Sequence, residues 1–173
     1  MISKEVSNVL KEQINKELFS AYLYLSMSAY FSDLGLNGFA NWMRVQFQEE
    51  QAHAMLIYDF IISRGEKVVL EAIEKPKNEW NNVLEVMEEV LTHEVYVTSL
   101  INNVLSVAEA SKDRATMSYF MWFIDEQVQE EASAQEIISN LKLIGDDKSA
   151  LYLLDKDLAT RVFTPPTKSA VAG

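Results

Sequence analysis

The sequence Glu50-Gln51-Ala52-His53 lies near the middle of a long segment whose apolar residues recur with the period of an α-helix. Glu50 and His53 are three residues apart, so they occupy the same helical face, one turn from each other. A carboxylate within an apolar face is costly to bury alone, and a bound cation offsets that cost. Carboxylate oxygen and imidazole nitrogen together suit iron, manganese or zinc. The segment therefore predicts a metal site between helices.

Three other long apolar segments also carry polar residues near their midpoints. Glu17 lies in the first, Glu94 in the third, and the pair Gln127 and Glu130 in the fourth. In an antiparallel bundle the midpoints meet whichever way each helix runs, so these side chains should face one another. One Glu-x-x-His pair is common on helix surfaces, but the conjunction across four segments indicates a buried metal centre. The predicted cluster comprises Glu17, Glu50, His53, Glu94, Gln127 and Glu130.

Two divalent cations would neutralise the four carboxylates of this cluster. We expect Glu50 to bridge the two cations. Glu17 and His53 would complete one site, and Glu94 and Glu130 would complete the other.

Two aromatic residues and a second histidine are placed near the cluster. Tyr24 is seven residues beyond Glu17 on the same helical face, and Trp122 is one turn before Glu126. Both rings are either redox partners of a metal or ordinary core aromatics. His93 points about 100° away from the neighbouring cluster carboxylate around the helix, so we do not expect it to be a ligand.

Glycine and proline are sparse, with 5 and 3 copies in 173 residues, which favours long helices. The apolar periodicity predicts helices over residues 3–34, 37–65, from 78 or 79 to about 110, 113–145 and, shorter, 147–162. Asn37 is the expected N-cap of the second helix, and residues 66–78, which include Pro76, are the expected long connection. The sequence therefore predicts an all-α four-helix bundle with a long crossover between the second and third helices and a short fifth C-terminal helix. The alternative is one continuous helix through residues 111–113, where a cap signal occurs without glycine.

The composition excludes several classes of protein. The net charge is −11 and the pI is about 4.6, which argues against nucleic acid and anionic membranes, since both need basic patches. The absence of Cys excludes disulfides, zinc fingers and thiolate catalysis. No apolar run is long enough to span a bilayer, and the first residues lack a signal-peptide pattern. We expect a soluble, cytoplasmic protein.

Residues 21–27 and 117–124 are apolar nearly all round the helix. Such a helix must bury a second side in addition to the side that faces its own core. In a small bundle we expect that second side to be an interface with another copy of the chain. The sequence therefore predicts a homo-oligomer.

With these residues, the chain resembles the ferritin family, and most closely the bacterial non-haem ferritins, over residues 1 to about 163. The resemblance implies a ferritin-like di-iron domain over 1–163 and a flexible tail over 164–173. It implies that Tyr24 and Trp122 lie beside a ferroxidase centre that binds two iron ions per subunit, roughly as in other di-iron bundles. The residues that correspond to that centre, with the carboxylate that prokaryotic ferritins add, are Glu17, Glu50, His53, Glu94, Gln127 and Glu130.

The resemblance also implies a third iron site, formed by Glu49, Glu126 and Glu130. Prokaryotic ferritins commonly have another Glu on the fourth helix, where this chain has Gln129. Because a neutral amide attracts a hard cation less than a carboxylate does, we expect the third site to be weak. The alternative is that the third site is absent.

Other branches of the family match less well. Bacterioferritins have Glu-x-x-His on the fourth helix and a haem-ligating Met after the second-helix Glu. This chain has Gln127-x-x-Glu130 and Gln51, so no haem is expected. Animal ferritins line three-fold channels with acidic residues where this chain has Met117 and Phe120. The fifth helix favours a cage of about 24 subunits over the smaller cage of mini-ferritins.

The expected function is iron storage with ferroxidase activity. Fe²⁺ binds at the paired sites, O₂ or H₂O₂ oxidises it, and Fe³⁺ is stored as a ferric mineral inside the cage. One alternative is a ferritin-like di-iron oxidase or peroxidase without storage, such as a rubrerythrin relative; the lack of Cys counts against the rubredoxin-like domain of that family. Another is a helical scaffold whose buried carboxylates pair with Lys or Arg, although the inner faces offer few basic partners.

Overall fold

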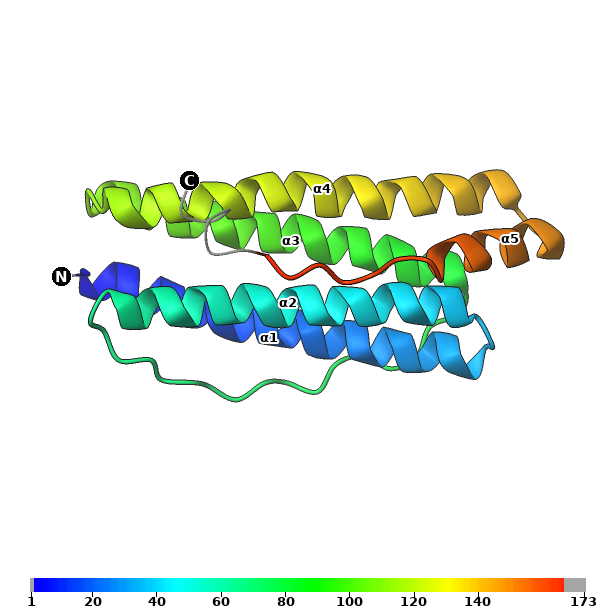
Figure 1. Cartoon of the computed structure of the whole chain (residues 1–173), viewed down its shortest axis with the longest axis horizontal. Helices are drawn as coiled ribbons and strands as arrows, with labels where there is room; N and C mark the ends of the chain where they lie inside the picture. The colour runs from blue at the N-terminus through cyan, green and yellow to red at the C-terminus, as the bar shows by residue number, and fades with distance from the viewer. Residues whose placement is uncertain (1, 167–173) are drawn as a thin grey trace.

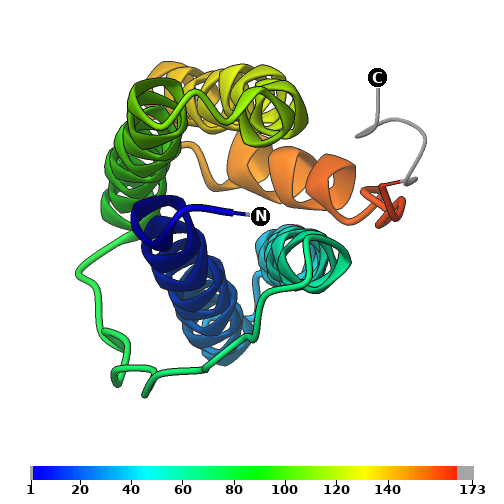
Figure 2. The same cartoon turned by 90° about the vertical axis from the view of Figure 1, so that its left-hand side faces the viewer.

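The computed structural model describes residues 2–166, and all regular secondary structure in that range is helical. The helices are α1 (Lys4–Asp33), α2 (Asn37–Ser63), α3 (Val83–Ala110), α4 (Arg114–Ile144) and α5 (Lys148–Leu158). Helix α1 packs mainly against α2, and α3 mainly against α4, as the end-on view in Figure 2 shows. Helix α5 lies across one end of the bundle (Figure 1). The predicted all-α four-helix bundle with a short fifth helix is confirmed.

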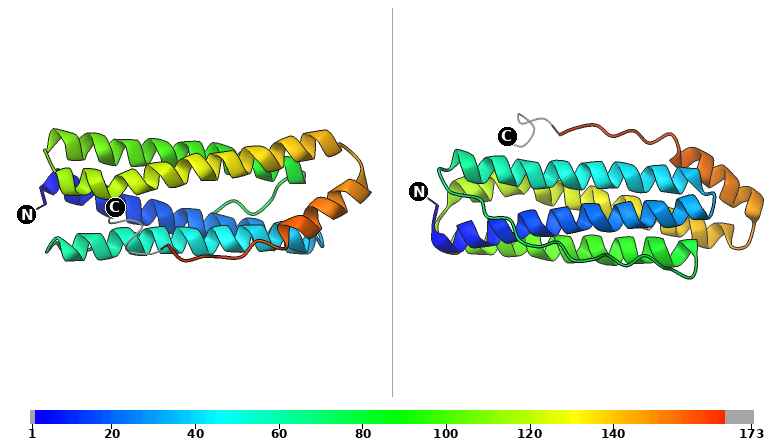
Figure 3. Two further views of the ribbon diagram at one scale, coloured as in Figure 1. Left: turned by 45° about the horizontal axis from the view of Figure 1, so that its top comes forward. Right: turned by 90° about the horizontal axis from the view of Figure 1, so that it is seen from below.

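A long irregular segment, residues 64–82, connects α2 to α3 along the length of the bundle (Figures 1 and 3). It confirms the predicted crossover and lets α2 and α3 run in the same direction. The expected start of the third helix at 78 or 79 is wrong, because α3 begins at Val83. Asn82 caps α3 by accepting a hydrogen bond from the backbone N of Glu85 at 2.9 Å. The Asn81 backbone N and side chain both donate to the Glu85 carboxylate, which fixes the chain in a turn before the helix.

The start of α2 also differs from the prediction. Asn37 is the first helical residue, and the N-cap is Leu36, whose side chain makes no capping hydrogen bond. The cap comes instead from Asp155 in α5, whose Oδ1 accepts hydrogen bonds from the backbone N of Gly38 at 2.7 Å and of Phe39 at 3.1 Å. A Cβ on Gly38 would lie 1.6 Å from the backbone O of Asp155, so only glycine allows this approach. Gly38 is therefore a packing site inside α2 and not a helix breaker.

Helix α5 ends at Leu158 and not at the expected residue 162. Past this point the Asn41 side-chain amide donates to three backbone oxygens, at 3.3 Å to Leu158, 3.4 Å to Ala159 and 3.0 Å to Arg161. These contacts hold residues 159–161 against α2 and replace the bonds that a longer helix would make. Residues 164–166 have no regular secondary structure. The rest of the predicted flexible tail, 167–173, lies outside the described residues.

The break between α3 and α4 is real, so the alternative of one continuous helix is excluded. Lys112 adopts a left-handed backbone conformation with φ of 55°, without the glycine that usually takes this role. Asp113 then caps α4 by accepting from the backbone N of Thr116 at 3.1 Å. Arg64, just after α2, pairs with the Asp113 carboxylate at 3.1 Å and ties the two helix ends together.

The apolar core consists of two clusters of buried side chains, one toward each end of the bundle. Every one of the four long helices contributes to both clusters, and the polar residues of the predicted metal centre lie between the two contributions. On α1, for example, Glu17 lies between Ile14 in one cluster and Leu23 in the other. The bundle therefore has one polar layer at mid-height with packed apolar layers on both sides.

Several apolar side chains in the two strongly apolar stretches point away from the core. Tyr22 is 49% exposed, Leu25 38% and Met121 53%. None of the helices in the described part of the chain has the length and apolar character needed to cross a bilayer.

Replacing Asp155 with Ala should detach α5 from the start of α2. Two backbone N–H groups would lose a charged acceptor, so we expect the free energy of unfolding to fall by about 1–2 kcal/mol. Chemical denaturation followed by circular dichroism measures the change. The control is Asp157→Ala, which removes an exposed carboxylate from the same helix. An equal loss in both variants would show that Asp155 does not act as the cap.

Candidate di-metal centre

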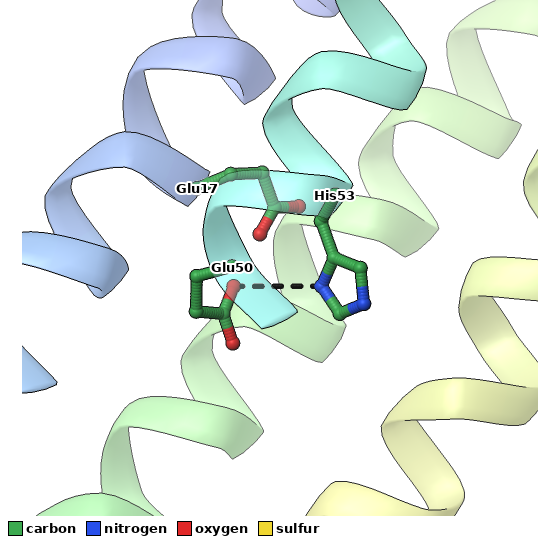
Figure 4. Close-up of side chains that lie close together, drawn as sticks. All are labelled: Glu17, Glu50 and His53. Carbon is green, nitrogen blue, oxygen red and sulfur yellow. Dashed lines mark ion pairs between the residues drawn. The ribbon is translucent and has the colours of Figure 1, made fainter. Parts of the chain in front are cut away.

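Glu17 from α1 and Glu50 and His53 from α2 converge at mid-bundle, as Figure 4 shows. One donor atom from each residue lies within 4.8 Å of the other two, and all three residues are buried. Glu50 Oε2 is 3.5 Å from His53 Nδ1. The Glu-x-x-His spacing brings both side chains to the buried side of α2, one turn apart. Two oxygen donors and one imidazole at this separation can hold one divalent cation.

Glu94 from α3 and Gln127 from α4 form a second group in the same layer. The Gln127 side-chain amide donates to Glu94 Oε2 at 3.0 Å and to the Glu94 backbone O at 3.2 Å. It also approaches Thr98 Oγ1 at 3.3 Å. The Tyr24 hydroxyl donates to Glu94 Oε1. Both oxygens of this buried carboxylate are therefore held in place by neighbouring side chains.

Glu130 is buried on α4 and is held by a residue that the sequence analysis did not single out. The Gln46 side-chain amide donates to Glu130 Oε2 at 2.8 Å. Similarly, the Gln13 amide donates to Glu17 Oε1 at 2.8 Å. Both glutamines were missed, although the sequence carries a signal: each lies four residues before a cluster carboxylate, at Glu50 and Glu17, and hence on the same helical face. The two amides orient the carboxylates of this layer.

The carboxyl groups at mid-bundle are strongly perturbed. Burial raises the pKa of Glu17 well above its usual range, and the neighbouring Glu50 adds to the effect. Burial also raises the pKa of Glu50, with a further contribution from Glu94. The pKa of Glu94 is raised to about 7, first by burial and then by the charge of Glu130. Without a cation, the layer therefore favours protonated carboxyls near neutral pH.

The described part of the chain offers these carboxylates neither a lysine nor an arginine partner. Within residues 2–166, neither Lys nor Arg forms an ion pair with Glu17, Glu50, Glu94 or Glu130. Glu17 Oε2 and Glu50 Oε2 are buried without a hydrogen-bond partner. Native proteins rarely leave such atoms unpaired, and a cation bound between them would satisfy both. This donor set fits iron, and it contradicts a scaffold in which Lys or Arg pairs with the buried carboxylates.

The aromatic residues and the second histidine lie around the layer. The Trp122 ring packs edge-on against His53, with centroids 5.5 Å apart. The Tyr24 ring packs edge-on against His93 at 6.1 Å. His93 Nε2 lies 2.8 Å from Ser20 Oγ, and burial lowers the pKa of His93 to about 4. His93 is thus directed to Ser20 and lies outside the Glu17, Glu50 and His53 group.

The residues expected to form a third site lie next to the layer. Glu49 Oε2 pairs with Arg161 Nη2 at 2.7 Å, and Glu130 is held by Gln46. Burial raises the pKa of Glu49 to about 7, with Arg161 acting in the opposite direction. Burial also raises the pKa of Glu126, which is half-buried. Gln129 is exposed. Because the Gln129 side chain is exposed, it is compatible with a third iron site to which Gln129 contributes no ligand.

Comparison with known proteins places the chain in one family. A family model for the ferritin-like domain matches residues 7–144. A bacterial non-heme ferritin of Staphylococcus saprophyticus is 43% identical over 163 residues, which cover 94% of this chain and 98% of the relative. One of Bacteroides fragilis is 42% identical over 161 residues, 93% of this chain and 100% of the relative.

Solved structures agree with the sequence relatives. A novel open pore ferritin from the hyperthermophilic archaeon Archaeoglobus fulgidus superposes with a TM-score of 0.93 at 50% identity, covering 94% of this chain and 100% of that one. An engineered closed form of the same ferritin also gives a TM-score of 0.93. The family model, the full-length relatives and the shared fold agree: the chain belongs to the ferritin family.

Proposed function

We propose that this protein stores iron and has ferroxidase activity, with Fe²⁺ as its substrate. The observation that carries the proposal is the buried layer of carboxylates, two of whose oxygens have no hydrogen-bond partner. No Lys or Arg in the described part of the chain neutralises the layer. A pair of Fe²⁺ ions would supply the missing charge. Membership of the ferritin family, with non-heme ferritins as full-length relatives, supports the choice of iron.

In this proposal the protein side chains bind and orient the metal ions. Besides burial, both Glu94 and Glu17 act on the pKa of Glu50, which supports Glu50 as the bridge between the two groups. Glu17 and His53 would complete one site, and Glu94 and Glu130 the other. Iron itself supplies the redox chemistry: each Fe²⁺ loses one electron to O₂ or H₂O₂.

The second ligand group has support from Gln127 and Tyr24. Gln127 holds the Glu94 carboxylate from α4, and Tyr24 holds it from α1. Because the Tyr24 phenol already contacts this carboxylate, it would be the nearest oxidisable side chain to a metal bound there. We propose Tyr24 as a participant in the oxidation step, and Glu49 and Glu126 as ligands of a weak third iron site that shares Glu130.

Storage requires a closed assembly, which we propose to be a homo-oligomeric cage of about 24 subunits. The exposed Tyr22, Leu25 and Met121 on two strongly apolar stretches support contacts between copies. The acidic, Cys-free sequence is compatible with a cytoplasmic location, which we also propose. A di-iron oxidase without storage would use the same ligands, and particle size separates the two functions.

The protein should therefore elute as a particle of roughly 470 kDa, since each chain has a mass of 19.7 kDa. Size-exclusion chromatography with light scattering measures this mass. After Fe²⁺ is added in air, sedimentation should show iron that travels with the particle, well beyond about two ions per subunit. A stable monomer or dimer that turns over Fe²⁺ without retaining it would instead support the oxidase alternative.

Replacing Glu50 with Gln should slow the initial oxidation of Fe²⁺ by about 100-fold or more, because the proposed bridge between the two ions is lost. Stopped-flow absorbance measures the rate, and anaerobic titration calorimetry counts the bound Fe²⁺. His53→Ala should weaken mainly one of the two ions. The exposed substitution Glu12→Gln on α1 is the control. Oxidation at the unaltered rate in Glu50→Gln would refute the bridging role.

The stability of the metal-free protein should depend on Glu94 in a defined pH window. The pKa of Glu94 is about 7 in the folded state against an ordinary value of 4.5, so the folded state retains a proton that the unfolded state releases between these values. The Glu94 contribution to the free energy of unfolding is therefore largest below pH 4.5 and is lost as the pH rises to about 7. At about 1.4 kcal/mol per pKa unit the loss is up to about 3 kcal/mol.

Chemical denaturation with a chelator present, at several pH values, tests this dependence. The stability of Glu94→Gln relative to the unaltered protein should increase from pH 4.5 to 7. Comparing the two proteins removes the opposite contribution of His93, whose lowered pKa applies equally to both. Glu109→Gln, an exposed change on the same helix, should give no such trend. A difference in the free energy of unfolding between the two proteins that stays constant from pH 4.5 to 7 would show that Glu94 does not cause this pH dependence.

A further inference from the structure

The segment that follows α5, residues 159–166, runs back along α2 toward the middle of the bundle (Figures 1 and 3). We call it the C-terminal segment. Asn41 holds its first residues through backbone oxygens, including that of Arg161 at 3.0 Å. The Arg161 guanidinium packs over the Trp42 ring, 4.5 Å from the centroid. Its Nη2 donates to Glu49 Oε2 at 2.7 Å. The segment is thus attached to α2 at Asn41 and Trp42, which are adjacent, and at Glu49, about two turns further along the helix.

The far end of the C-terminal segment forms one wall of an open cavity of about 320 Å³ beside the di-metal layer. Helix α2 contributes Glu49 and His53, and α4 contributes Trp122 and Glu126. The third wall is formed by Thr164, Pro165 and Pro166. His53 belongs both to this cavity and to the proposed metal centre. A cation that moves between the centre and the cavity would therefore pass next to Glu49 and Glu126.

Of the Glu49 and Glu126 carboxylates, Glu49 forms an ion pair with Arg161. The ion pair with Glu49 is mostly shielded from solvent, with 25% of the Arg161 side chain and 21% of the Glu49 side chain exposed. A metal cation at Glu49 Oε2 would compete with the Arg161 guanidinium for the same oxygen. The two positive charges would also repel each other. The positive charge of Arg161 partly neutralises Glu49 and so weakens the attraction between this carboxylate and a metal ion.

The guanidinium is only partly satisfied in this position. Its Nη1 atom is buried and has no hydrogen-bond partner within the described residues. An unpaired buried donor lowers the net stability of the arrangement. The backbone at Arg161 is held separately by Asn41, so the side chain can leave Glu49 without release of the segment. The Arg161 side chain is therefore held less completely than the backbone that carries it.

We propose that Arg161 is a positioning residue for Glu49: it holds the carboxylate in the absence of metal, and a cation must displace it to occupy the cavity between Glu49 and Glu126. The proposal rests on the proposed function, because it concerns the exchange of iron next to His53. It adds a residue outside the four-helix bundle that limits how strongly this cavity retains cations, and it accounts for why the C-terminal segment lies along α2.

The test uses Tb³⁺ as a redox-inert probe and the complete, metal-free protein. Tb³⁺ in this cavity lies near Trp122, so excitation of the indole should sensitise its emission. Arg161→Gln should bind this Tb³⁺ at least about tenfold more tightly, which corresponds to about 1.4 kcal/mol. Lys156→Gln is the matched control, since it removes an exposed positive charge from the neighbouring helix. Trp122→Phe should remove the sensitised emission, which identifies the indole that transfers the energy. Because Trp122 also packs against His53 of the proposed metal centre, it is Glu49→Gln that assigns the ion to the cavity, and this variant should remove the emission change.

Unchanged Tb³⁺ affinity in Arg161→Gln would overturn the proposal, as would an equal gain in Lys156→Gln. A crystal of the unaltered protein soaked in saturating Tb³⁺ needs no substitution. An anomalous peak at Glu49 with Arg161 displaced supports the proposal, whereas a peak with the ion pair intact, or no peak, overturns it. The Fe²⁺ count at the di-metal centre, measured in the same variants, reports separately on the proposed function. Tighter Tb³⁺ binding without Fe²⁺ binding would leave only the Arg161 proposal standing, and the reverse result would leave only the ferroxidase.

Discussion

The burial of several carboxylates in one layer, where no Lys or Arg within residues 2–166 neutralises them, is the constraint on which the structure of this protein depends. Desolvation disfavours each charge, and the carboxylates repel one another, so the pKa values of Glu17, Glu50 and Glu94 all rise. A folded chain can tolerate such a layer only if other interactions hold the helices together. The layer is consequently a region of low intrinsic stability, and the cations proposed to bind there would stabilise it.

The two apolar clusters supply that compensation. Each long helix crosses from one cluster to the other, so every long helix is packed into apolar core on both sides of the polar layer. The carboxyl groups are then oriented by neutral amides: Gln13, Gln46 and Gln127 donate to them without adding charge. Neutral donors thus orient these groups without placing a positive charge in the layer.

Helix α5 and the segment after it link the end of the bundle to its centre. Asp155 caps α2 at one end, Asn41 holds the chain one turn later, and Arg161 reaches Glu49 beside the metal layer. These contacts place residues 159–166 along the helix that carries Glu50 and His53. The position of that helix and the environment of its ligands are therefore coupled to an element outside the bundle.

The sequence by itself determined the helices and the layer of the site, because both follow from local periodicity. The spacing of apolar residues fixes which face of each helix is buried, and residues near helix midpoints must meet in an antiparallel bundle. The cap signal at residues 111–113 indicated a break there but left one continuous helix as an alternative, which the structure excludes through the left-handed Lys112 and the Asp113 cap. The predicted helix ends were less accurate where a residue far away in the sequence provides the cap in place of a neighbouring residue, as Asp155 does at the start of α2.

Only the tertiary structure decided which polar residues pair across helices. Gln46 with Glu130 and Arg161 with Glu49 are separated by 84 and 112 positions along the chain, and nothing in the local pattern couples them. The same holds for Gly38, whose lack of a side chain matters only because the α5 backbone passes within van der Waals distance. Periodicity tells which face of a helix is buried. The partner that fills a given position on that face depends on the three-dimensional packing of segments far apart in sequence.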